Sequence, residues 1–149
     1  MEEYKYIIIP LVSIVIAQII KTIIETISTK HFSFERLLNG AGGMPSTHTT
    51  AVISLTTLIY IDYGLSSELF AICLIFSLIV MYDAMGIRYE TGKQAEIINI
   101  LAKKANLKES FVLLKEKIGH KPIEVLGGII TGIFIAVVLQ NIIICKAIA

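Results

Sequence analysis

Charged residues are scarce in this sequence, and their scarcity argues against a soluble globular domain. Only 17% of the 149 residues are Asp, Glu, Lys or Arg, whereas 55% are hydrophobic and the mean hydropathy is +0.78. A soluble domain has about 25% charged residues, because its surface must be wetted. The composition therefore predicts an integral membrane protein, and the length is that of a single domain, residues 1–149.

Other features are missing as well. No face combines Lys and Arg with interleaved aromatic residues, so nucleic acid is not expected as a partner. The two cysteines, Cys73 and Cys145, lie in apolar runs and are interpreted as inert buried thiols that do not indicate a redox compartment. The N-terminal MEEYKY is acidic where a secretory signal is basic, and no small-residue cleavage site follows, so the first apolar run is expected to be retained.

Long apolar runs are what the sequence does contain. A bilayer core is crossed by about 20 helical residues, and the candidate runs cover residues 6–26, 49–63, 67–84 and 123–144. The predicted fold class is thus all-α, an integral membrane bundle of about four transmembrane helices. Because the second run is short, its polar start is expected to lie in protein or water.

The connection between the third and fourth runs, residues 88–121, has apolar residues at helical spacing and lysines on the other face. This pattern predicts an amphipathic helix, or two short ones, on the cytoplasmic surface of the membrane. The apolar positions are Ile97, Ile98, Leu101, Leu107, Phe111 and Leu114.

Basic residues favour one orientation in the membrane. The first and third connections lie on the same side and carry most of the Lys and Arg, whereas the other side has Lys5 and Lys146. By the positive-inside tendency these connections face the cytoplasm and both termini face outward, in the cell (inner) membrane. The basic residues of the two connections are Lys30, Arg36, Arg88, Lys93, Lys103, Lys104, Lys108, Lys115, Lys117 and Lys121.

The first apolar run contains ionisable residues that a membrane helix does not need for spanning. Gln18, Lys21, Thr22 and Glu25 share one helical face, because residues three, four and seven apart stack along the axis. An isolated charge inside a span costs at least about 2.5 kcal/mol. Lys21 is therefore either neutralised by Glu25 near the membrane boundary or, in the interpretation we prefer, directed at an anion inside the bundle.

The segment GGMPSTH, residues 42–48, starts the second run with features of an anion site. Pro45 suits the first turn of a helix, and the glycines before it let the chain bend into that helix. The first-turn amides, the hydroxyls of Ser46 and Thr47 and the helix dipole would then converge on one point, as at phosphate-binding helix starts. His48 adds a proton donor that works near neutral pH. The alternative is an ordinary helix start.

A second cluster, GHKPIEVLGG, residues 119–128, is expected on the same membrane face. His120 and Glu124 are four apart, so the carboxylate can hold one ring nitrogen and raise the basicity of the other. This is the arrangement of a histidine nucleophile or general base. Further along, Gly128 and Gly132 have the small-xxx-small spacing that lets helix backbones approach closely.

The third cluster, MYDAMGIRYETGKQA, residues 81–95, ends the third run on that same face. Asp83 and Arg88 are expected to be neighbours in a turn. Arg88 offers a planar fork of donors for phosphate oxygens, and Lys93 offers a point charge. The alternative is that these charges only anchor the span at the membrane boundary.

Taken in chain order, the motifs QIIK, GGMPSTH, MYDAMGIR, GKQA and LKEKIGHKPIEVLGG resemble those of the divergent branch of the type 2 phosphatidic acid phosphatases, membrane relatives of the vanadium haloperoxidases. The resemblance covers nearly all of residues 14–135. It implies that His120 attacks phosphorus, that Glu124 activates His120, and that His48 protonates the leaving oxygen. The phosphate would be held by Arg88, by Lys21 (or else by Lys30 with Arg36), by Ser46 and by Thr47 and the amides after it. Further candidates at the site are Lys93, Gln18 and Asp83.

The sequence departs from the motifs of the parent family in several places. A long connection separates Arg88 from His120, which are a few residues apart in the parent motif. Thr47 stands where that motif has glycine, Glu124 replaces an aspartate, no Lys-spaced Arg-Pro is present, and four spans replace six. These departures bear on turnover more than on anion binding.

The resemblance implies an integral-membrane lipid phosphate phosphatase that hydrolyses a phosphomonoester or pyrophosphate through a phosphohistidine, with no metal or other cofactor. The expected partner is a membrane lipid phosphate, and a core of four spans could also assemble as a homo-oligomer. Two alternatives stay open. The same basic pocket could serve a non-enzymatic protein that binds or transports a phospholipid or anion. The side chains of His48, His120, Asp83 and Glu124 are also metal-ligand types, although at no recognised metal spacing.

Overall fold

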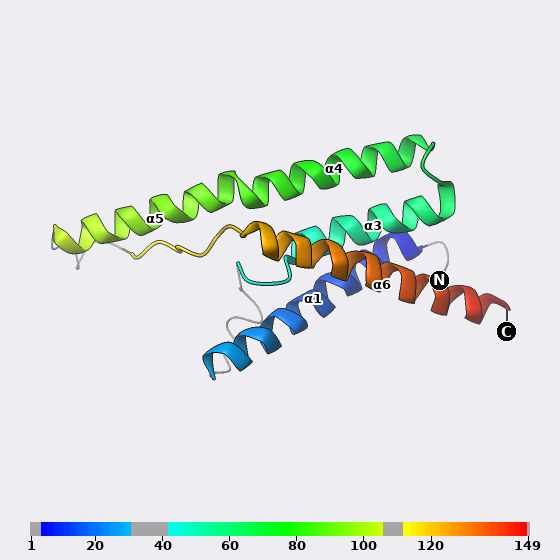
Figure 1. The fold of residues 1–149 in the computed structure, drawn as a ribbon, viewed down its shortest axis with the longest axis horizontal. Helices are drawn as coiled ribbons and strands as arrows, with labels where there is room; N and C mark the ends of the chain where they lie inside the picture. Colours follow the sequence, from blue (N-terminus) through cyan, green and yellow to red (C-terminus); the bar gives the residue numbers. More distant parts are fainter. Residues whose placement is uncertain (1–3, 31–41, 106–111, 149) are drawn as a thin grey trace.

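The computed structural model describes residues 4–30, 42–105 and 112–148, and the regular structure within these ranges is entirely helical. Its helices are α1 (Lys5–Thr29), α3 (Thr47–Tyr63), α4 (Glu68–Met85), α5 (Ile87–Lys104) and α6 (Pro122–Ile148). The predicted all-α membrane bundle is confirmed (Figure 1).

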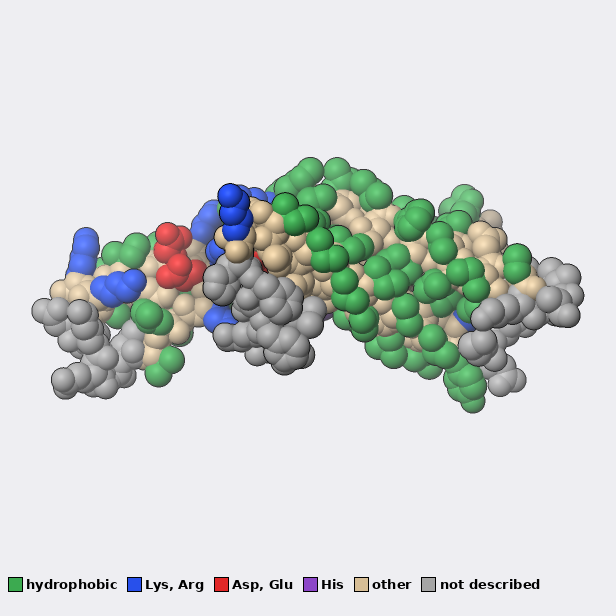
Figure 2. Space-filling view, turned by 90° about the horizontal axis from the view of Figure 1, so that it is seen from below, with side chains coloured by type: hydrophobic (Ala, Val, Ile, Leu, Met, Phe, Trp, Pro, Cys, Tyr) green, Lys and Arg blue, Asp and Glu red, His purple; other side chains and the backbone are tan. Residues whose placement is uncertain are grey.

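Within the described residues, three stretches are long and apolar enough to cross a membrane: Lys5–Thr29, Glu68–Lys104 and Pro122–Ile143. The remaining predicted span is the second run, which forms α3. It has 17 residues, which at 1.5 Å per residue is about 25 Å, somewhat less than a hydrocarbon core of about 30 Å. α3 packs against α1, α4 and α6 and is therefore enclosed by the longer helices. Figure 2 shows hydrophobic side chains over the bundle, whereas charged side chains gather toward the end that carries α5.

The buried face of α3 is made largely of small hydroxyl residues. Thr49, Thr50 and Ser54 are fully buried. The Thr50 hydroxyl donates to the carbonyl of Ser46 one turn earlier, and the Thr56 hydroxyl lies 2.9 Å from the Ser77 hydroxyl on α4. Since lipid offers no hydrogen-bond partners, hydroxyls satisfied inside the protein let helices pack closely without an unpaired polar group.

α6 crosses α3 at its two predicted small residues, Gly128 and Gly132. A Cβ on Gly128 would lie 2.8 Å from the Ser46 carbonyl oxygen, and one on Gly132 would lie 2.7 Å from the Thr50 carbonyl oxygen. Neither position has room for a side chain, so the two helix backbones are in contact. The predicted close approach at the small-xxx-small spacing is confirmed, since both glycines face α3 and not lipid.

The end of α1, the start of α3, the end of α4 and the start of α6 lie at the same end of the bundle (Figure 1). Two backbone hydrogen bonds fix this arrangement: Ser46 N donates to Glu124 O at 3.0 Å, and His120 N donates to Ala84 O at 3.0 Å. The three sequence clusters therefore share one end of the bundle. That this end faces the cytoplasm stays a prediction.

The opposite end of the bundle is closed by Asp62 near the end of α3. Its carboxylate accepts from Lys5 Nζ at 2.9 Å and from the Tyr6 hydroxyl at 2.7 Å, both on α1, and from Gln140 Nε2 on α6 at 3.0 Å. These contacts tie three helices together at this end. His48 and His120 lie at the other end of the bundle, near the starts of α3 and α6.

The third connection is helical over its first half, and α5 continues the direction of α4 away from the bundle (Figure 1). Its buried residues are small or polar, namely Gly92, Ala95, Asn99 and Ala102, because the chain after it returns along this face. The apolar positions at helical spacing form the exposed side, where Ile97 and Leu101 are each 58% exposed. Leu114 lies in the non-helical return, and Leu107 and Phe111 lie outside the described residues.

We expect Gly128→Leu and Gly132→Leu to lower the thermal midpoint of the detergent-purified protein. Each added side chain would meet α3 backbone, and overpacking of this kind costs about 1–3 kcal/mol or more. The matched control is Ile130→Leu, because Ile130 lies between the two glycines and is 62% exposed, so its replacement should change stability by less than about 0.5 kcal/mol. Midpoints of both glycine variants equal to that of the wild type would contradict the close crossing.

Candidate functional site

The start of α3 is built by Gly42, Gly43 and Ser46. Both glycines have positive φ, 75° and 85°, which gives the sharp bend expected before the helix. Ser46 is the N-cap, and its hydroxyl accepts from Thr49 N at 3.4 Å and from the Thr49 hydroxyl at 3.0 Å. Pro45 lies before the cap and not in the first turn as predicted. The helix nevertheless starts where the sequence indicated.

The two hydroxyl residues of this segment are turned inward. Ser46 is fully buried and Thr47 is 9% exposed. The Ser46 hydroxyl caps α3, so one of its roles is to stabilise the start of this helix. The positive end of the α3 dipole is the feature of this segment that is directed at the polar end of the bundle.

Lys21 reaches this helix start from α1. It is 2% exposed and continues the buried face of α1 formed by Ile9, Ser13 and Ala17 at intervals of four. Its aliphatic chain packs under the bend, since a Cβ on Gly43 would lie 3.5 Å from Lys21 Cγ. The buried Lys21 side chain thus lies beside the start of α3; that it is directed at a bound anion stays a prediction.

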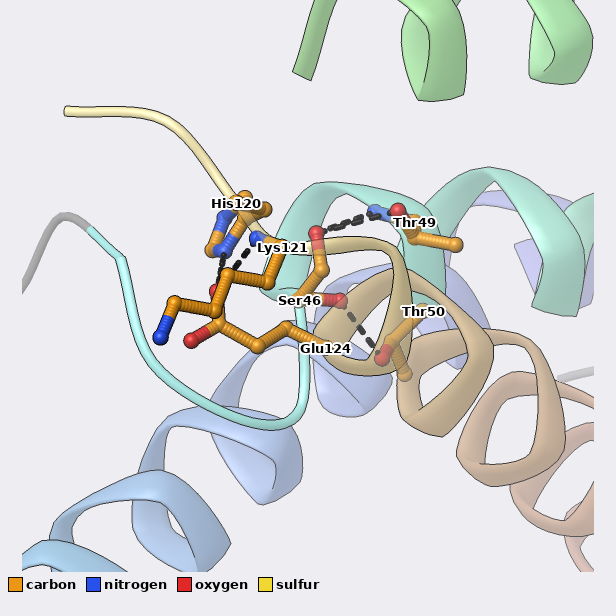
Figure 3. A network of polar contacts seen from close by, with 6 residues as sticks. All are labelled: Ser46, Thr49, Thr50, His120, Lys121 and Glu124. Carbon is orange, nitrogen blue, oxygen red and sulfur yellow. Dashed lines mark hydrogen bonds and ion pairs between the residues drawn. The ribbon is translucent and has the colours of Figure 1, made fainter. Parts of the chain in front are cut away.

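His120 and Glu124 form the predicted pair at the start of α6 (Figure 3). His120 Nδ1 lies 3.0 Å from Glu124 Oε2, and the same oxygen accepts from Lys121 N at 3.1 Å. α6 begins at Pro122, so the helix does not extend back to His120. The carboxylate turns back toward the residues before the helix, and it holds the imidazole and one backbone amide together.

The environment of His120 favours a neutral ring with one usable nitrogen. Burial lowers the pKa of the His120 imidazole, the hydrogen bond to Glu124 raises it, and the charges of Lys21 and Arg88 lower it, with a net decrease. When the proton is on Nδ1, facing the carboxylate, Nε2 carries the free lone pair. His120 is therefore suited to act as a nucleophile or base at neutral pH.

His48 and Arg88 complete the cluster. His48, the second residue of α3, is within electrostatic range of Arg88, His120 and Lys21, which lie on separate segments of the chain. Arg88 Nε donates to Asp83 Oδ2 across the junction of α4 and α5. The predicted proximity of Asp83 and Arg88 is confirmed, and Arg88 remains 47% exposed.

The remaining candidates are Lys93 on α5 and Gln18 on α1. Lys93 Nζ is 2.8 Å from Glu90 Oε1 and 4.6 Å from the centre of the Tyr89 ring, so it is held along α5. It lines a cavity of about 350 Å³ that also touches Glu124. Gln18 is half-buried on α1, and its backbone carbonyl accepts from the Thr22 hydroxyl.

Asn99 is a residue of this end of the molecule that the sequence analysis missed. It is 2% exposed. Its Nδ2 donates to Leu114 O and to Glu116 Oε1, and its Oδ1 accepts from Leu114 N, all at 2.9 Å. It thereby fastens the returning segment, which ends in His120, to α5. The available signal was a polar amide among Gly92, Ala95 and Ala102 on one helical face.

Two glycines also let the returning segment pack directly against α5. A Cβ on Gly92 would lie 2.3 Å from the Glu116 carbonyl oxygen, and one on Gly119 would lie 2.3 Å from Tyr89 N. The backbone before His120 therefore follows α5 without intervening side chains.

Of the four candidate metal ligands, Asp83 pairs with Arg88 and Glu124 with His120, and the described ranges hold no cluster of three His, Cys, Asp or Glu suited to a metal ion.

We expect the ring of His120 to titrate below 6.5 in an NMR titration, with the signal assigned from its loss in His120→Asn. Glu124→Gln should lower this midpoint further, because it removes the carboxylate that raises the pKa of His120. A midpoint that rises in Glu124→Gln would show that the carboxylate does not stabilise the charged ring. Glu90→Gln, which alters an exposed pair on α5, is the control and should leave it unchanged.

Comparison with known proteins agrees with this architecture. A family model described as the Divergent PAP2 family matches residues 3–135. The uncharacterized membrane protein YuiD of Bacillus subtilis (strain 168) is 41% identical over 142 residues, which cover 87% of this chain and 89% of the relative. No solved structure matches the chain. The chain belongs to the divergent PAP2 family.

Proposed function

We propose that this protein is a metal-independent membrane phosphatase that removes phosphate from a lipid phosphate through His120. The observation that carries the proposal is the His120–Glu124 pair, 3.0 Å apart with the imidazole buried, at an end of the bundle where Lys21 and Arg88 exert positive charge. An oriented imidazole beside fixed cations is what attack on a phosphate ester requires. Membership of the divergent PAP2 family supports the same chemistry.

The reaction would proceed in two steps. His120 Nε2 attacks phosphorus, so the P–N bond forms while the P–O bond to the lipid alcohol breaks, and His48 gives the departing oxygen its proton. Glu124 stabilises the ring as it becomes positive, and Lys21 and Arg88 stabilise the phosphoryl oxygens. Water, deprotonated by His48, then attacks the phosphohistidine and releases inorganic phosphate, which restores both histidines.

The location of the site supports a membrane substrate. The cluster lies where four helices end or begin, so it is placed at a boundary of the apolar bundle and not at its middle. A phosphate headgroup at this depth would belong to a lipid whose chains remain in the bilayer. The positive-inside count supports placing this site on the cytoplasmic side of the inner membrane.

A non-enzymatic binder of phospholipid or anion would use the same charges without turnover. The two are separated by incubating the purified protein in detergent with a panel of lipid phosphates, with and without a chelator, and measuring inorganic phosphate. We expect release that the chelator leaves unchanged. Binding without release would establish the binder, and release that is lost on chelation and restored by a divalent metal would establish a metal enzyme.

We expect His120→Ala and His120→Asn to lower kcat by at least about 10³-fold, because both remove the covalent route. Glu124→Gln should lower kcat about 10- to 100-fold, since the amide still orients the ring but does not neutralise its charge. Acid-quenched reactions with labelled substrate should contain a phosphohistidine in the wild type. A phosphohistidine that persists in His120→Ala would rule out His120 as the nucleophile.

The role of His48 makes a different prediction. His48→Ala should lower kcat about 10²- to 10⁴-fold for alkyl phosphates, whose leaving oxygen is strongly basic, but much less for an aryl phosphate that leaves without a proton. The comparison of kcat for the two substrates in wild type and variant checks this. An equal loss for both would show that His48 does not protonate the leaving group.

A further inference from the structure

An apolar groove opens between α4 and α6, beside the polar end of the bundle. Its volume is about 640 Å³, within the range of about 300–1,000 Å³ that is typical of ligand sites. The walls include Leu78, Met81 and Met85 on α4 and Val125, Leu126 and Ile129 on α6. These apolar side chains favour contact with a hydrocarbon chain.

The groove has a closed floor and an open side. Met81 and Val125 are 9% and 3% exposed, whereas Leu78 and Leu126 are each 50% exposed. The groove is thus backed by packed side chains and open at its rim. In a bilayer this open side would face lipid chains.

The gap between α4 and α6 follows from how each helix packs on α3. α6 contacts α3 through Gly128 and Gly132, and α4 contacts α3 through Ser77, whose hydroxyl is 2.9 Å from that of Thr56. α3 therefore separates the other two helices over most of their length. Residues of α4 and α6 that point toward each other are left to line a groove and not to form a tight helix pair.

The groove ends next to His120. Met85 and Pro122 line its end, and the neighbouring residues are joined directly, since His120 N donates to Ala84 O at 3.0 Å. Val125 on its floor directly follows Glu124, which holds the imidazole. An apolar groove whose end lies beside a cationic, histidine-bearing site matches an amphiphile with one phosphate head.

We propose that the groove between α4 and α6 binds one hydrocarbon chain of a lipid phosphate whose phosphate lies at His120. The protein then takes its substrate sideways from the bilayer, and the chain sets the position of the phosphate. This inference rests on the proposed function for the identity of the head group. It adds a binding site for the chain, located on other residues.

Kinetics with two substrates tests the groove. Leu126→Trp should raise KM at least about 10-fold for a long-chain lipid phosphate, because the indole fills the groove, and should leave kcat/KM for a short water-soluble alkyl phosphate unchanged. Ile130→Trp is the control, because Ile130 is also on α6 and is 62% exposed but does not line the groove. Equal KM values for the long-chain substrate in wild type and Leu126→Trp would overturn the proposal.

A binding measurement makes the test independent of turnover. The sequence has no Trp, so Tyr82→Trp, at a lining residue that is 73% exposed, introduces a single, selectively excited tryptophan at the rim. In phosphatidylcholine nanodiscs, phosphatidic acid with brominated chains should quench this fluorophore more than the same mole fraction of brominated phosphatidylcholine. In Ile130→Trp the two lipids should quench equally.

The outcomes of the two experiments are distinct. Preferential quenching by phosphatidic acid without phosphate release would contradict the proposed phosphatase function but support the groove as a lipid phosphate site. Equal quenching of the Tyr82→Trp fluorophore by the two lipids would overturn the groove, whether or not phosphate is released.

Discussion

The crossing of α3 and α6 is the contact on which the candidate site depends. Gly128 and Gly132 carry no Cβ, so the helices approach until Ser46 N can donate to Glu124 O at 3.0 Å. This bond joins the first turns of both helices, and it places two positive helix ends side by side. Lys21 and Arg88 add two cations to the same end. Asp83 pairs with Arg88 and Glu124 with His120, so the two helix ends and Lys21 are the groups that chiefly support the proposed phosphate site.

The path of α5 explains the long separation of Arg88 and His120 in the sequence. The chain leaves the site at Arg88, at the start of α5, and returns along the same helix to His120. Asn99 holds this return by three hydrogen bonds of 2.9 Å, and Gly92 lets the backbone approach. The excursion therefore restores the proximity that the parent motif achieves within a few residues. Arg88 and His120 are thus neighbours in space although a long connection separates them in the sequence, since Gly119 packs on Tyr89.

Features with a local cause could be predicted from the sequence. The lengths of the apolar runs located the helices of the bundle, the spacing of Gly128 and Gly132 indicated the close crossing, and the four-residue spacing of His120 and Glu124 indicated the pair. Features that depend on distant segments could not be predicted. The role of Asn99 requires knowing that residues 114–116 return along α5, and periodicity within α5 could not show which of its faces that segment covers.

The inward position of Ser46 changes how a phosphate would be held. The sequence predicts Ser46 and Thr47 as phosphate-binding residues, but the Ser46 hydroxyl caps α3 and Thr47 is 9% exposed. The segment therefore contributes chiefly through its backbone and dipole, and not through side-chain oxygens. A threonine where the parent motif has glycine fits this arrangement, because a side chain buried against the bundle does not occupy the site. In the proposed function, recognition of the phosphate is then left to the side chains of Lys21, Arg88, His48 and His120.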